Sequence, residues 1–273
     1  MNVIDRRQFI IAKTAYKKDR FKSVQLRNGF ILSYDIDLDV QQGKFGILLG
    51  NAFSCTQERI DLDNPEVEKT RFTWAGRWIL ITEHYLYIDA CGSLGCYVYN
   101  KDGEVILSSS LHLMKNFTKT SWIANYQIQY DDGLPYMDYY PIPFTPFKDI
   151  IKILPSQYYN FINNKAEYYH IDESYEKFRE YDVEELYSRL TYYLNNIFIT
   201  IKHRYDKNIW IPLTAGVDSR TNVALAVHNK MTFGAFTIKR ENTKKWDILI
   251  PKLICGKIRC KHIYYDDRDA SDT

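Results

Sequence analysis

Eight residues, Leu213 to Arg220, constrain the fold of this 273-residue chain more than any other segment. They read Leu-Thr-Ala-Gly-Val-Asp-Ser-Arg, follow the apolar run that begins at Ile209, and precede an Ala/Val/Leu-rich segment typical of a helix. A strand, a loop of small residues and a helix N-terminus together present backbone N–H groups and a positive dipole end, which favour phosphate. The Asp218 carboxylate suits a divalent metal held against that phosphate.

The chain around this loop alternates between predicted strands and helices. Strands are predicted at 209–213, 232–238 and 262–265, and helices at 219–228 and 244–254. Such alternation indicates a parallel sheet with helices on its faces, and ligands then bind at the carboxyl ends of the strands.

A long helix is predicted before the first of these strands. Asp182 and Glu185 have the spacing of an N-cap and its partner three residues later. A stripe of apolar residues at helical spacing follows, which we interpret as core: Val183, Leu186, Leu190, Leu194, Ile197 and Ile201.

The first half of the chain is rich in short strand patterns. Strands are predicted at 29–36, 45–49, 78–81, 85–88, 96–99 and 105–107, and Lys101-Asp102-Gly103 is a hairpin turn signal. We expect a meander of antiparallel strands. Five prolines between residues 131 and 155 then predict an extended connector.

The expected fold class is therefore α/β, with an antiparallel sandwich in residues 1–175 and a parallel, Rossmann-like sheet in 176–273. The hydrophobic fraction of 45% is ample for a packed core. The net charge of +2 argues against nucleic acid or an anionic membrane as a partner. No run approaches the ~20 apolar residues that span a bilayer, and Met1 to Arg7 leads into no secretory signal.

Five cysteines are expected to be reduced structural thiols of a cytoplasmic protein. The alternative is a metal site, because Cys91 and Cys96, and Cys255 and Cys260, form spaced pairs, and His262 lies close to the second pair. Neither pair has a typical metal-ligand pattern.

The loop resembles the pyrophosphate-binding loop of the N-type ATP pyrophosphatases, Ser-Gly-Gly-x-Asp-Ser. Residues 214–219 match it with Thr for Ser and Ala for the first Gly. The flanks Pro212-Leu213 and Arg220 are similar to those of the asparagine synthetase-like amidotransferases. Residues 76–80, 89–97 and 145–155 resemble parts of that family's N-terminal amidotransferase-type domain, so the resemblance spans roughly residues 40 to 268.

The resemblance implies a nucleotide site and a chemistry. It implies that ATP and Mg²⁺ bind at the loop, that Asp218 ligates the metal, and that Leu213 and Ile238 lie beside the adenine. The implied nucleotide-binding residues are Leu213, Thr214, Ala215, Gly216, Val217, Asp218, Ser219 and Ile238. In the family a substrate carboxylate attacks the α-phosphate of ATP, and ammonia or an amine then displaces AMP. Asp247 matches a family aspartate, but its role and that of Arg220 stay open.

Two departures from the family pattern limit this expectation. Glutamine-using members carry a cysteine nucleophile at the exposed N-terminus, whereas Asn2 stands second here and the nearest cysteine is Cys55. We therefore expect no glutaminase activity, and no catalytic residue is assigned. Family synthetase domains also continue to a second Gly/Asp-containing motif. The sequence to Thr273 lacks that motif, which leaves a fragment, a split protein or a degenerate member as alternatives.

Three functions remain open at this point. The first is an ATP-dependent, AMP-forming amide ligase that takes a small-molecule carboxylate and ammonia or an amine. The second is a non-catalytic homologue that binds nucleotide or a partner subunit, which includes assembly as a homo-oligomer. The third is an enzyme that acts on tRNA, which the absence of a basic stripe disfavours.

Overall fold

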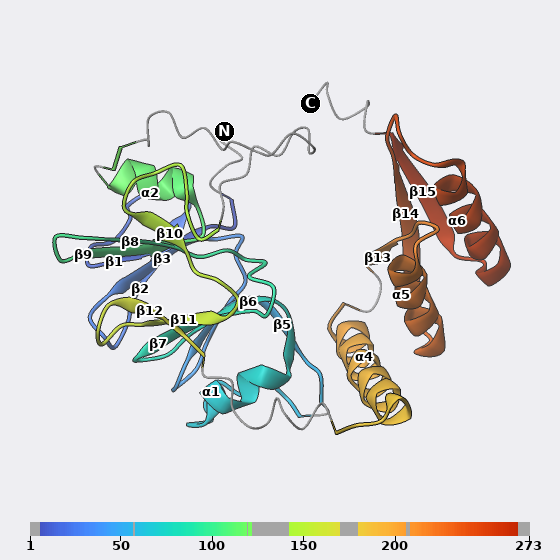
Figure 1. Cartoon of the computed structure of the whole chain (residues 1–273), viewed down its shortest axis with the longest axis horizontal. Helices are drawn as coiled ribbons and strands as arrows, with labels where there is room; N and C mark the ends of the chain where they lie inside the picture. Colours follow the sequence, from blue (N-terminus) through green and yellow to red (C-terminus); the bar gives the residue numbers. More distant parts are fainter. Residues whose placement is uncertain are drawn as a thin grey trace. The chain divides into compact units, whose positions relative to one another are not determined.

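A computed structural model describes residues 6–56, 58–118, 120–121, 142–169, 180–205 and 208–266. The chain divides into two compact units (Figure 1). The first comprises Met1–Ala52 and Arg59–Arg179, and the second Phe53–Glu58 and Glu180–Thr273. The boundary expected between residues 175 and 176 lies outside the described residues.

Two six-stranded antiparallel sheets build the first unit. Their strand orders are β10-β8-β9-β1-β3-β2 and β12-β11-β7-β6-β5-β4. The first sheet consists of β1 (Phe9–Ala12), β2 (Phe21–Gln25), β3 (Ile31–Asp35), β8 (Tyr97–Lys101), β9 (Glu104–Ser108) and β10 (Ile150–Lys152). The second consists of β4 (Val40–Gln42), β5 (Ile47–Ser54), β6 (Trp74–Ile81), β7 (Tyr85–Ile88), β11 (Gln157–Asn160) and β12 (Lys165–Tyr168).

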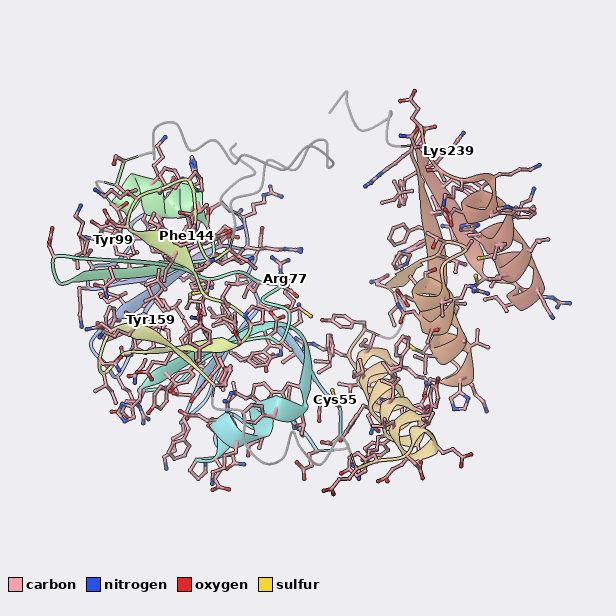
Figure 2. All side chains as sticks on the ribbon, in the orientation of Figure 1. Cys55, Arg77, Tyr99, Phe144, Tyr159 and Lys239 are labelled. Carbon is pink, nitrogen blue, oxygen red and sulfur yellow. The ribbon has the colours of Figure 1, made fainter. Side chains whose placement is uncertain are left out.

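The core of this unit lies between the two sheets. Phe9, Ile11 and Leu107 from the first sheet belong to one buried cluster with Ile79 and Leu86 from the second. Alternation along each strand directs these side chains inward, so the two sheets form a sandwich. Tyr159 is fully buried in the same cluster and is labelled within the first unit in Figure 2.

The predicted hairpins are confirmed, and β4 to β7 form the expected meander in the second sheet, but the first sheet is not a meander. Asp102 and Gly103 both have positive φ in the β8–β9 turn, as a two-residue hairpin requires. The strand β1 then inserts between β9 and β3, although it was not predicted. All four of its residues are buried, because the sandwich core covers one face and a second apolar cluster with the helix α2 (Leu111–Phe117) covers the other. A strand buried on both faces shows no alternation.

The proline-rich segment is not solely a connector. Residues 122–141 lie outside the described residues, but Ile150–Lys152 pairs with β8 as the edge strand β10. The hairpin β11–β12 follows and extends the second sheet. The short helices α1 (Val67–Thr70) and η2 (Arg71–Thr73) precede β6.

The second unit confirms the predicted α/β class and its parallel sheet. The strands β13 (Ile209–Pro212), β14 (Phe233–Lys239) and β15 (Lys261–Asp266) pair in parallel in the order β13-β14-β15. The helices α5 (Val217–His228) and α6 (Lys245–Ile258) connect them. Val223 and Ala226 of α5 and Cys255 of α6 share one buried cluster with Ile211 and Ala235 of the sheet.

The long helix α4 (Val183–Tyr205) begins where predicted, with the Asp182 carboxylate accepting a hydrogen bond from the Glu185 amide at 2.8 Å. The interpretation of its apolar stripe as core is wrong for the first half, where Val183 and Leu190 are 66% and 52% exposed. Phe198, outside that stripe, is buried. Helical spacing identifies residues that share a face, but not whether another element covers it. Neither α4 nor any other helix in the described ranges is long and apolar enough to cross a membrane.

Candidate functional site

The loop from Thr214 to Gly216 joins β13 to α5 at the carboxyl edge of the parallel sheet. Lys239, labelled in Figure 2, ends the neighbouring strand β14 at the same edge. Gly216 is the N-cap of α5 and has an extended conformation with φ −64° and ψ 151°. Because glycine has no side chain, no side-chain group caps this helix. The first amide groups of α5 therefore have no partner within the helix, which suits this helix start to an anion.

The Ser219 hydroxyl organises the inside of the loop. The Thr214 amide donates to Ser219 Oγ at 3.0 Å, and the Thr214 and Ser219 hydroxyl oxygens are 3.1 Å apart. Ser219 Oγ also lies 3.2 Å from the Thr214 carbonyl and 3.1 Å from the Gly216 carbonyl, to either of which it can donate. The Gly216 amide donates to Thr214 Oγ1 at 3.1 Å. Two residues five positions apart thus close the loop on itself.

Ala215 stands where the family loop has glycine, and the structure accommodates it. Ala215 is not among the described residues with positive φ, so its side chain causes no strain in the left-handed region. Gly216 has less freedom, because a Cβ there would lie 3.2 Å from Thr214 Oγ1. A side chain at Gly216 would therefore press on the Thr214 hydroxyl, which the loop uses for its internal hydrogen bonds.

Asp218 is the acidic residue in the first turn of α5. Its side chain is exposed, and the bonds that close the loop involve Thr214, Gly216 and Ser219 rather than Asp218. A carboxylate here, beside uncapped amides, can hold a divalent cation and leave the amides to phosphate oxygens. Arg220 turns back on the loop, with Nε donating to the Gly216 carbonyl at 3.3 Å.

Leu213 and Ile238 occupy different environments. The Leu213 side chain is fully buried in the core of the second unit, so only its backbone can face a ligand. Its amide donates to the Phe236 carbonyl at 2.8 Å, which ties the start of the loop to β14. Ile238, near the end of β14, is 45% exposed and its side chain is free to contact a ligand.

A buried hydrogen-bond chain lies beneath the loop. Thr237 Oγ1 donates to the Leu213 carbonyl at 2.7 Å and lies 2.9 Å from His262 Nε2. A hydroxyl has one proton, so His262 Nε2 must be the donor of the second bond. Burial lowers the pKa of His262 and favours its neutral form. These hydrogen bonds connect Leu213, the residue after β13, to β14 and β15 below the site.

Asp247 is a site residue to which the sequence assigned no role. It lies in the first turn of α6, and its Oδ1 accepts a hydrogen bond from the Ala215 amide at 2.9 Å. The separation of 32 residues hides this contact from local patterns. The available signal was its place at the start of the helix after the next strand, since that end of α6 lies at the same sheet edge as the loop.

The five cysteines, all within the described residues, form no disulfide. Cys91 is exposed and Cys96 buried in the first unit, where burial raises the pKa of Cys96. In the second unit Cys255 is buried, and burial together with a hydrogen bond to Cys260 raises the pKa of Cys255 to about 12. Asn2, which stands at the position of the expected cysteine nucleophile, lies outside the described residues. Within the described ranges no three His, Cys, Asp or Glu side chains form a metal-binding group.

Comparison with known proteins gives little further information. No protein-family profile matches the chain, and no curated protein sequence does. Among solved structures, a glutamine-dependent NAD+ synthetase from Acinetobacter baumannii in complex with ADP shows a weak likeness, with 11% sequence identity and a TM-score of 0.28. The match covers 45% of this chain and 22% of that one, so the chain spans about a fifth of the length of that protein. A likeness at this TM-score indicates no function.

Proposed function

We propose that the second unit binds the phosphates of ATP at residues 214–219, together with Mg²⁺, and that the protein uses this site in an ATP-dependent, amide-forming ligase reaction. One observation carries the proposal. A helix without a side-chain cap begins at the carboxyl edge of a parallel sheet, and its first turn presents the exposed Asp218 carboxylate. Uncapped amides attract anions, and a carboxylate beside them attracts the cation that accompanies a polyphosphate.

Each residue of the loop has a place in this proposal. The amides of the first turn of α5 and the hydroxyls of Thr214 and Ser219 would contact the pyrophosphate part of ATP. Asp218 would hold Mg²⁺, which neutralises charge as pyrophosphate leaves. The backbone at Leu213 and the exposed side chain of Ile238 would border the adenine. These contacts would stabilise charge that develops on the leaving group.

The proposed reaction has two steps. A small-molecule carboxylate attacks the α-phosphorus of ATP, the bond to the β-phosphate oxygen breaks, and pyrophosphate leaves with its electron pair. Ammonia or an amine then attacks the acyl carbon, AMP leaves, and the nitrogen loses a proton. Cytoplasmic localisation and assembly with a second subunit or a second copy belong to the same proposal.

Nucleotide binding is tested by titrating the protein with ATP and Mg²⁺ in a calorimeter. Asp218→Ala should weaken the affinity by at least tenfold, since it removes the metal ligand. Thr221→Ala, on the same helix one turn from the loop, is the matched control and should bind as the wild type does. Equal affinity in Asp218→Ala and the wild type would remove the metal role from Asp218.

The ligase step needs a separate assay, because a homologue that only binds nucleotide would pass the titration. Exchange of radiolabelled pyrophosphate into ATP, dependent on an added carboxylate, reports the first chemical step. Exchange that is lost in Asp218→Ala supports the ligase. Background exchange across a panel of carboxylates, in a protein that does bind ATP, favours the non-catalytic or partner-dependent homologue.

A further inference from the structure

The hydrogen bond from the Ala215 amide to Asp247 Oδ1 joins the phosphate loop to a different helix. The other described side-chain hydrogen bonds of residues 214–216 stay within the loop and α5. They involve the side chains of Thr214, Ser219 and Arg220. The Asp247 contact therefore fixes the loop relative to α6, which the internal bonds cannot do.

Asp247 is itself held in place. Its amide donates to the Lys244 carbonyl at 2.9 Å, and it lies in the first turn of a helix of 14 residues that packs on the sheet core through Cys255. The residue is half-buried. A charge-assisted bond from a backbone amide is stronger than a neutral one.

We propose that Asp247 is a positioning residue for the phosphate site. It holds the Ala215 amide away from the anion, and this fixes Gly216, the N-cap, so that the amides of the first turn of α5 converge on phosphate. Asp247 does not contact the phosphate in this arrangement. The inference rests on the proposed function, because a loop that binds no polyphosphate has nothing to position.

The sign of the effect separates positioning from simple electrostatics. A carboxylate close to a polyphosphate repels it, so if charge alone mattered, both Asp247→Asn and Asp247→Ala would bind the anion more tightly. If the hydrogen bond matters, the Asn side-chain oxygen still accepts from the Ala215 amide and retains the geometry. Ala cannot accept that bond, and the loop loses its anchor.

The test is calorimetric titration of the full chain with inorganic pyrophosphate and Mg²⁺. Asp247→Ala should weaken binding about tenfold, the loss expected for one hydrogen bond to a charged group. Asp247→Asn should bind within about threefold of the wild type. Asp182→Ala is the matched control, because it also removes a carboxylate that accepts an amide at a helix start in the same unit. It should leave pyrophosphate binding unchanged.

Three results would overturn the inference. The first is that Asp247→Ala binds pyrophosphate like the wild type, and the second is that it binds more tightly. The third is that Asp247→Ala and Asp182→Ala weaken binding equally, through a general loss of stability. Should Asp247→Ala not fold, Asp247→Glu displaces the same carboxylate by one methylene and must weaken binding for the inference to hold. Failure of the wild-type chain to bind pyrophosphate refutes the proposed function instead, so the two failures are distinguishable.

Discussion

The Asp35 carboxylate is a buried charge of the first unit that both backbone amides and an arginine side chain satisfy. Its side chain is 1% exposed. Oδ1 accepts from the amides of Arg7 at 3.0 Å and Asp37 at 3.1 Å, and Oδ2 accepts from Arg20 Nε at 3.0 Å. Arg20 also contacts Asp37 at the surface. Replacing Asp35 therefore removes the acceptor of two backbone amides and the buried partner of a guanidinium.

The structure gives the magnitude for two substitutions. Each amide left without an acceptor costs about 1–3 kcal/mol, and breaking a buried ion pair costs about 3–5 kcal/mol. Arg20 keeps 30% exposure and its second partner, so the lower end applies to its share. Taking the lower end for both amides as well, we expect Asp35→Ala to lower the free energy of unfolding by about 5 kcal/mol. Asp35→Asn keeps the oxygen that both amides need, so its loss should be about half as large.

Urea unfolding followed by tryptophan fluorescence measures this loss. Trp74 and Trp78 are buried in the first unit, whereas Trp210 and Trp246 of the second are 41% and 61% exposed, so the spectral change reports mainly on the first unit. A loss of about 5 kcal/mol moves the midpoint by about 2–5 M urea.

Asp37→Ala is the control for Asp35, because it removes the exposed partner of the same arginine and should cost less than about 1 kcal/mol. Equal midpoints for Asp35→Ala and Asp37→Ala would refute the reasoning. So would a larger loss for Asp35→Asn than for Asp35→Ala.

Three further outcomes are expected. Burial raises the pKa of Asp35, but the hydrogen bonds that its carboxylate accepts outweigh burial, and the pKa is lowered. The stabilisation by Asp35 is therefore complete above the unfolded pKa near 4 and is lost as the pH falls through the folded pKa. The difference in unfolding free energy between the wild type and Asp35→Asn should narrow below about pH 4. Gly50→Ala should lower the free energy of unfolding by more than about 2 kcal/mol, because φ is +80° and the new Cβ would lie 2.3 Å from the Arg77 carbonyl oxygen. An unchanged melting temperature would contradict this prediction. In the second unit, Leu190→Ala should lower the free energy of unfolding by under about 1 kcal/mol and Phe198→Ala by about 3 kcal/mol or more. Thermal melts that show the reverse order would indicate that the predicted apolar stripe of α4 is core after all.

Local chemistry in the sequence determined much of the second unit. The alternation of strand and helix patterns predicted the parallel sheet, and the small residues after β13 predicted a loop at its carboxyl edge. The sequence also predicted the Asp182 cap and the Asp102-Gly103 turn, because each depends on residues at most a few positions apart. These signals describe backbone conformations that neighbouring residues themselves impose.

Other features depended on which elements pack together, and only the tertiary structure decided them. The strand β1 is covered on both faces and shows no alternation, while the apolar first half of α4 is exposed despite its helical spacing. Leu213 turns its side chain into the core, and Asp247 reaches the Ala215 amide across 32 residues. Periodicity predicts which side chains share a face, and loop composition predicts where the chain can turn. Neither pattern predicts which distant surface covers that face or which distant carboxylate accepts a hydrogen bond from that turn.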